Sequence, residues 1–177
     1  CTVTFPAGSQ TSDNLIGALR VRAAADTIDE GGDHYDLITA SATSTDPAYS
    51  TADGLGIRDL WVGIVDDDDV AVIVSPGSGL ETDEGGGSDT FQVSLGSQPA
   101  DDVRIVFLSS LPGEVVVNTA SLLFQPSGPN AWNLPQTVTV LGQQAATQPA
   151  GDRAFTIAVA VDPFNTLDAL YLDEAED

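Results

Sequence analysis

The sequence predicts an all-β protein built from antiparallel β-sandwiches, and three observations lead to this expectation. Short runs of β-branched and aromatic residues, often alternating with polar ones, recur along the 177 residues. Turn-forming clusters rich in Gly, Pro and Asp, such as "SPGSG" and "QPSGPN", separate these runs. No stretch carries a clear helical pattern. Many short strands joined by such turns are typical of a sandwich.

The expected strands of the N-terminal part begin with Ala18–Ala24, where Leu19, Val21 and Ala23 alternate with two arginines. That alternation favours a half-exposed strand over a helix, which Gly17 would interrupt. The other strands expected in this part are Thr2–Phe5, Tyr35–Thr43, Arg58–Val65 and Val70–Val74.

The C-terminal part contains further strand-like runs, and turn clusters such as "EGGGS" and "QPADD" lie between them. The strands expected there are Asp89–Leu95, Val103–Ser109, Ser121–Phe124, Gln136–Gly142 and Ala154–Val161.

Two segments of the chain share an internal pattern. The first begins at Phe5-Pro6 and reaches Asp46-Pro47, and the second begins at Phe124 and reaches Asp162-Pro163. Each ends in an acidic group. Residues 70–123 have no counterpart before Phe5, so the first copy lacks its front half. We therefore divide the chain into residues 1–69, half of a repeat, and residues 70–177, a nearly complete one.

A half-sandwich exposes an apolar sheet face and an open strand edge. We expect that either an upstream part of a longer protein or a neighbouring subunit covers them. The absence of Met indicates a mature chain, a fragment or part of something longer. Cys1, the single cysteine, excludes an internal disulfide, and it is either a lipidated residue or simply the start of a fragment.

The charge balance is strongly acidic, with 27 acidic residues, five arginines, no lysine and a net charge of −22. Such a surface repels nucleic acid and anionic membranes, and no run is long and apolar enough to span a membrane. It attracts cations. Two interpretations stay open, a solubility surface for a salty or extracellular medium and binding of divalent cations at particular clusters.

Specific residues resemble a known family. The stretches "GLETDEGGGSDTFQVSL", from Gly79, and "SLLFQPSGPNAWNLPQTVTVLG", from Ser121, are similar to the Calx-β-like repeats of bacterial surface and secreted proteins. "DTIDEGGDHYDL", from Asp26, and the run Asp66–Asp69 resemble the second half of that repeat. The resemblance implies tandem immunoglobulin-like antiparallel β-sandwiches, the first lacking its front half, with calcium bound at one end.

The resemblance also implies a set of calcium ligands, because calcium prefers six to eight oxygen atoms from carboxylates and carbonyls. Ala25 stands where the family often has a first Asp, and the front ligand of this copy is absent. The alternative for every cluster is a solvated acidic turn. The ligands expected in the first copy are Asp26, Asp29, Glu30, Asp66, Asp67 and Asp68.

In the second copy, Glu84 matches the front ligand. The middle loop Gly142–Asp152 keeps only Asp152 close by, so calcium is less expected here than in the first copy. The acidic residues that could replace the terminal run are Asp173, Glu174, Glu176 and Asp177.

We find no residue pattern in the sequence that indicates a catalytic site. His34 is the only histidine and has no cysteine nearby, which argues against zinc and against a catalytic triad. "EGGGS" lacks the lysine and helix of a phosphate loop, and Asp101-Asp102 is explained by turn capping. Trp61 and Trp132 are expected to pack in the core or at an edge rather than to bind sugar.

We therefore expect a non-enzymatic extracellular or cell-surface module of a bacterial adhesin, stalk or filament, in which calcium rigidifies the junction at Asp66–Asp69. Its partners are other copies of itself or adjacent repeats, and strand donation from a neighbour is one way to complete the first sandwich. The alternatives are a calcium-sensing regulatory domain and an accessory domain of a secreted hydrolase.

Overall fold

The computed structural model describes residues 21–51, 56–144 and 151–173, and within them the protein is almost entirely β-structure. The elements are β1 His34–Ile38, the 3-10 turn η1 Pro47–Tyr49, β2 Leu60–Ile64, β3 Val72–Ser75, β4 Ser88–Leu95, β5 Val103–Ser109, β6 Val115–Val117, β7 Ser121–Phe124, β8 Gln136–Gly142, β9 Ile157–Val161 and the helix α1 Ala169–Asp173. All strand pairs in these sheets are antiparallel. The all-β expectation is confirmed.

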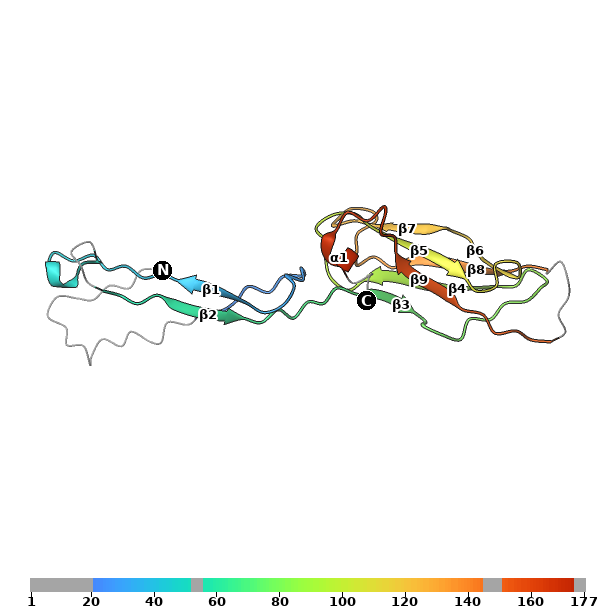
Figure 1. Cartoon of the computed structure of the whole chain (residues 1–177), viewed down its shortest axis with the longest axis horizontal. Helices are drawn as coiled ribbons and strands as arrows, with labels where there is room; N and C mark the ends of the chain where they lie inside the picture. The colour runs from blue at the N-terminus through green and yellow to red at the C-terminus, as the bar shows by residue number, and fades with distance from the viewer. Residues whose placement is uncertain (1–20, 52–55, 145–150, 174–177) are drawn as a thin grey trace.

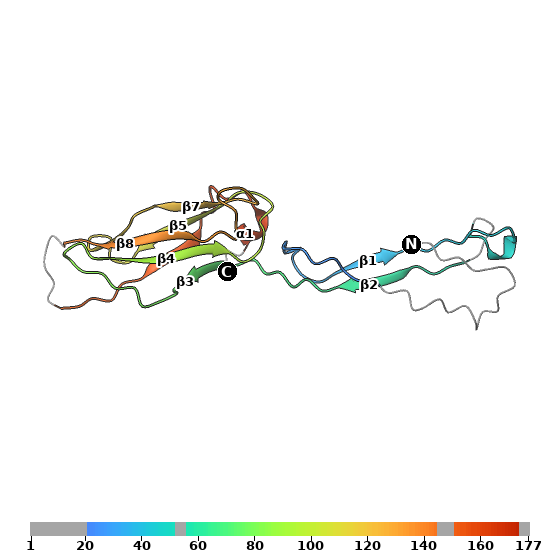
Figure 2. The same ribbon diagram turned by 180° about the vertical axis from the view of Figure 1, so that it is seen from behind.

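The strands form two parts that follow each other along the long axis of the molecule (Figure 1). β1 and β2 form a two-stranded ribbon. The remaining strands form a four-stranded sheet in the order β3-β4-β8-β6 and a three-stranded sheet in the order β7-β5-β9. Figure 2, seen from behind, places β3 at the margin of the four-stranded sheet.

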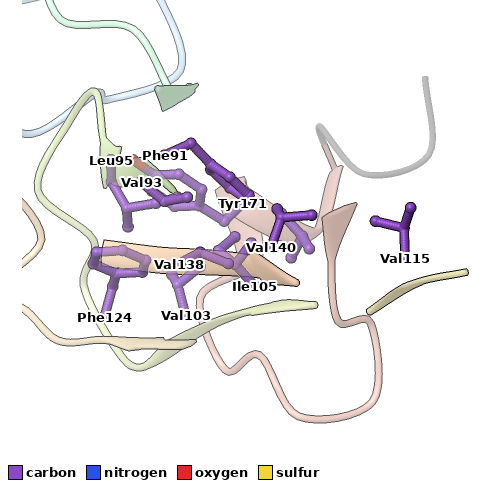
Figure 3. Close-up of a cluster of buried hydrophobic side chains, with 11 residues drawn as sticks. Phe91, Val93, Leu95, Val103, Ile105, Val115, Phe124, Val138, Val140 and Tyr171 are labelled. Atoms are coloured by element: carbon purple, nitrogen blue, oxygen red, sulfur yellow. The ribbon is translucent and has the colours of Figure 1, made fainter. Parts of the chain in front are cut away.

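One hydrophobic core joins the two larger sheets. Phe91, Val93 and Val138 come from the four-stranded sheet, while Ile105 and Phe124 come from the three-stranded sheet, and all five are buried. The alternation of buried and exposed positions in β4 explains why this sequence forms a strand with one face inward. Figure 3 shows these side chains in one cluster, with Tyr171 of α1 among them. The two sheets therefore pack in the manner of a β-sandwich.

Most predicted strands of the C-terminal part are confirmed. The predicted bounds of β5, β7 and β8 agree with the structure, and β4 begins one residue earlier than predicted. β9 is shorter than the predicted Ala154–Val161. In the N-terminal part, Thr2–Phe5 lies outside the described residues, and residues 21–24 are not in a strand.

Besides η1, two short elements of the sandwich were not predicted. β6 has three residues, fewer than a period-2 pattern needs to be recognised. Helix α1 has five residues, and it forms because the Asp168 carboxylate accepts hydrogen bonds from the backbone N–H groups of Tyr171 (3.0 Å) and Ala100 (2.6 Å). One turn of helix is too short to show a periodic sequence signal.

The ribbon of β1 and β2 leaves its apolar side chains uncovered within the part of the chain that the structure describes. Tyr35 is 73% exposed and Trp61 is 67% exposed, and Leu60 is exposed on the opposite face of the ribbon. The expectation that Trp61 packs is therefore wrong among the described residues, because none of them forms a second layer over the ribbon, whereas Trp132 packs against the core. An isolated two-stranded hairpin is only marginally stable in water.

Candidate functional site

The predicted acidic ligands of the first copy meet where the ribbon joins the sandwich. The antiparallel register pairs His34 with Ile64, so the loop before β1 lies beside the segment after β2. Hydrogen bonds join the two segments. The N–H of Glu30 donates to Asp66 Oδ2 at 2.8 Å, and the N–H of Val70 donates to Asp29 Oδ2 at 2.9 Å. Residues about 40 positions apart in sequence are thus neighbours.

Local turn chemistry shapes the loop that carries these ligands. Asp26 Oδ1 accepts from the N–H of Ile28 at 2.9 Å, and Asp29 Oδ1 accepts from the N–H of Gly31 at 2.6 Å. Gly31 and Gly32 have φ angles of 81° and 109°, which residues with a side chain rarely adopt. The "DEGG" sequence therefore lets the chain reverse direction immediately before β1.

The electrostatics of the cluster divide its carboxylates into two kinds. Desolvation, followed by the negative charges of Asp26 and Asp66, raises the pKa of Glu30. Desolvation and the charge of Asp67 likewise raise the pKa of Asp68. The N–H groups of Glu30 and Asp68, by contrast, lower the pKa of Asp66. Asp66 is held as an anion by the backbone, while Glu30 and Asp68 experience the repulsion of their neighbours.

These carboxylates suit calcium in chemistry but do not form a ready coordination shell. Among residues 21–51, 56–144 and 151–173, no three His, Cys, Asp or Glu side chains are arranged so that they could hold a metal ion. Both carboxylate oxygens of Asp29 and of Asp66 accept backbone N–H groups instead. Asp67 is exposed beside them. A cation would have to draw these carboxylates into a different arrangement.

The expected ligands of the second copy are not brought together. Glu84 lies in the loop that precedes β4, where the Asp83 carboxylate accepts from the N–H of Gly85 at 2.7 Å. Asp173 ends α1, which packs against Ser97, just beyond the other end of β4. The length of β4 thus separates Glu84 from Asp173, and Glu174, Glu176 and Asp177 lie outside the described residues.

A contact that the sequence did not predict fixes the junction against the sandwich. The backbone N–H of Gln98 donates to the carbonyl oxygen of Thr27 at 2.6 Å, and Thr27 Oγ1 donates to Gln98 Oε1 at 3.0 Å. A cavity of about 120 Å³ lies beside this contact, lined by residues of the junction, of the β4–β5 loop and of α1. The "QPADD" cluster was recognised only as a turn, because turn residues carry no signal for a partner 71 positions away.

Two Asp-Pro turns of the internal pattern have the same hydrogen bonds. Asp46 Oδ1 accepts from the N–H of Ala48, and Asp162 Oδ1 accepts from the N–H of Phe164, both at 3.0 Å. The carbonyl oxygen of Asp46 accepts from Tyr49 at 3.0 Å, and that of Asp162 from Asn165 at 3.4 Å. Asn165 Nδ2 also donates to Asp162, and this bond contributes most to lowering the pKa of Asp162.

Comparison with known proteins found no matching family model and no similar curated protein. In the described part of the chain, every helix falls short of the length and apolar character that a membrane crossing requires.

Proposed function

We propose that this protein is a non-enzymatic, extracellular structural or adhesive module of a bacterial surface protein or filament, built from Calx-β-like repeats, in which calcium stiffens the junction between the ribbon and the sandwich. The observation that carries the proposal is the convergence of Asp26, Asp29, Glu30 and Asp66 at that junction. An ion bound at a junction between two parts of a chain alters the angle between them and needs no catalytic chemistry.

The physical mechanism is electrostatic. Adjacent carboxylates repel each other, and desolvation together with that repulsion raises the pKa values of Glu30 and Asp68. A bound calcium ion replaces the repulsion by attraction, since it takes oxygen ligands at loosely constrained geometry. The residues that would hold it are Asp26, Asp29, Glu30, Asp66, Asp67 and Asp68. Because no closed shell is preformed among the described residues, further oxygen ligands come from water or from a neighbouring chain.

The exposed ribbon supports the structural part of the proposal. Tyr35 and Trp61 would be stabilised by a covering layer, which an adjacent repeat or a neighbouring subunit supplies in a filament. An assembly that buries this ribbon joins modules end to end without requiring an active site.

The test is a calcium titration of the full chain by calorimetry, with small-angle scattering at each step. We expect weak binding, with a Kd of roughly 10⁻⁴–10⁻³ M as in extracellular modules, and a narrower distribution of molecular dimensions when calcium is bound. Asp66→Asn with Asp68→Asn abolishes both effects. Asp101→Asn with Asp102→Asn removes the same charge in the β4–β5 loop and leaves both effects unchanged.

Two results would contradict the proposal. Micromolar affinity with a change of shape within the sandwich would instead indicate a calcium-sensing domain. The absence of any difference between the two double variants would show that the acidic run acts only as a solvated surface.

A further inference from the structure

The outer edge of β9 lacks a strand partner among the described residues. β9 is the last strand of its sheet and pairs only with β5. The N–H of Ser110 donates to Thr156 O at 2.9 Å, and the N–H of Asp162 donates to Arg104 O at 2.8 Å. In an antiparallel ladder, the backbone N–H and C=O groups of every second residue face the partner strand. These two bonds show that the backbone groups of the even-numbered residues of β9 face β5. The N–H and C=O groups of Ile157 and Val159 therefore point away from β5, toward the open edge.

The side chains next to this edge are incompletely covered. Ile157 and Val159 pack against the core but are only partly buried, and so are Val72 and Val74 of β3. β6, at one margin of the four-stranded sheet, contacts β5 of the other sheet. β3 is at the opposite margin of the four-stranded sheet, and it therefore faces the position next to β9 that no described strand fills. The sheet of β9 has one strand fewer than the sheet it faces. One more strand beside β9 would cover these four side chains.

The internal pattern indicates which strand fits that position. β1 precedes the turn at Asp46-Pro47, and after this turn the chain returns as β2, antiparallel to β1. β9 directly precedes the turn at Asp162-Pro163, which has the same hydrogen bonds. In residues 162–173, however, the chain continues into α1 and not into a strand. The position beside β9 thus corresponds to the one that β2 occupies beside β1.

Charge favours the same strand. A β2 strand antiparallel to β9 brings the carboxylates of Asp66–Asp69, which follow it, to the N-terminal end of β9. Arg153 lies four residues before β9, and its side chain is 43% exposed although it pairs with Glu114. The chain has only five Lys and Arg residues, and one of them, Arg153, lies near the N-terminal end of β9, where it would attract these carboxylates.

We propose that the outer edge of β9 binds β2 of a second copy by antiparallel strand addition. β2 pairs only with β1 in the described structure, so its other edge remains available. The contact joins two different surfaces, and such heterologous contacts propagate head to tail. The inference rests on the proposed structural function and specifies its acceptor and donor strands.

The first test is self-association of the full chain, measured by analytical ultracentrifugation over a range of concentrations at about 0.15 M salt, where charge repulsion is screened. Val159→Pro removes an N–H at the open edge and leaves the β5 ladder intact. Val117→Pro is the matched control, because the N–H of Val117 also points outward, from the edge strand β6. We expect at least a tenfold loss of association for Val159→Pro only. Equal association of both variants overturns the inference.

The second test does not depend on the folding of a variant. A synthetic peptide of residues 58–69, "RDLWVGIVDDDD", is added to the wild-type chain, and amide hydrogen exchange is followed by NMR. We expect added protection at Ile157 and Val159, and none with a peptide of the same composition in scrambled order. Protection only at β1, or none at millimolar peptide, overturns the inference.

The two proposals fail separately. If calcium still narrows the distribution of molecular dimensions but the peptide does not protect the amides of β9 from hydrogen exchange, only the strand addition is wrong. If β9 binds the peptide but the acidic run does not respond to calcium, only the calcium role is wrong.

Discussion

Aspartate in this chain serves first as a backbone acceptor. In six turns of the residues that the structure describes, an Asp side chain accepts a hydrogen bond from the N–H two residues later. The side chain thereby imitates a backbone turn, which explains why acidic residues accumulate between strands. The turns themselves were predictable from sequence for this reason. Which acidic turns also bind a cation is not, because the same local bond forms with or without a ligand.

Buried Tyr171 supports a prediction at the residue scale. Its hydroxyl donates to the carbonyl oxygen of Ser97 at 2.8 Å, and its ring is 1% exposed beneath α1. Tyr171→Phe keeps the ring and leaves that carbonyl without its donor. We expect a loss of about 1 kcal/mol in the free energy of unfolding, measured by urea denaturation at pH 7. Tyr49→Phe, at an exposed position, is the control with no expected loss.

The same residue gives a dependence on alkaline pH. Burial raises the pKa of Tyr171 above its ordinary value of 10.0. The unfolded chain therefore releases this proton before the folded chain does, and stability present below pH 10 falls as pH rises through the folded pKa. Tyr171→Phe removes this contribution, so its stability declines less steeply above pH 10. Parallel curves for wild type and variant would contradict the assignment.

Strands of the sandwich were predictable because burial imposes a period of two on the sequence. In β5, Val103 and Ile105 are buried, while Arg104 between them and Val106 after them are not. The ribbon carries apolar residues on both faces, so sequence alone could not tell which face is covered. Short elements such as α1 depend on tertiary contacts, here those of Asp168 with Ala100 and of Tyr171 with Ser97. Local sequence patterns carry no information about such contacts.

This difference between the parts predicts their independent stability. In the described part of the chain, the buried apolar residues all lie between positions 91 and 171, and none belongs to the ribbon. We expect residues 70–177 to unfold cooperatively as an isolated fragment, because their core is complete apart from the position beside β9. Residues 21–69 alone are expected to show no cooperative transition by circular dichroism. A cooperative transition in residues 21–69 would show that the ribbon is stable without a covering layer.

At the scale of the whole molecule, the candidate site lies where the ribbon joins the sandwich. The β1–β2 register brings together the segments of Asp29, Glu30 and Asp66, which the sequence resemblance had grouped as ligands. It could not supply the bond between Thr27 and Gln98, which depends on how the ribbon joins the sandwich. The orientation of the two parts therefore depends on a few polar contacts at the junction.

The last prediction concerns those contacts. Gln98→Ala removes the side-chain bond to Thr27 and the bond of Gln98 Nε2 to the carbonyl oxygen of Pro126 at 3.2 Å. Spin labels at Asp36→Cys and Asn118→Cys, with Cys1→Ser, report the distance between ribbon and sandwich by pulsed electron resonance. We expect a broader distance distribution for Gln98→Ala than for the parent without calcium.

Gln92→Ala, an exposed position within β4, is the matched control and is expected to leave the distribution unchanged. On the proposed function, we expect calcium to narrow the Gln98→Ala distance distribution only in part, because the ion would connect the two acidic segments but would not replace the bonds to the β4–β5 loop. Complete narrowing by calcium would instead mean that the acidic run alone fixes the angle between the two parts. Equal widths without calcium for both Gln variants would show that the side-chain bonds of Gln98 do not orient the ribbon, because the backbone bond from the Gln98 N–H to the Thr27 carbonyl oxygen remains in Gln98→Ala.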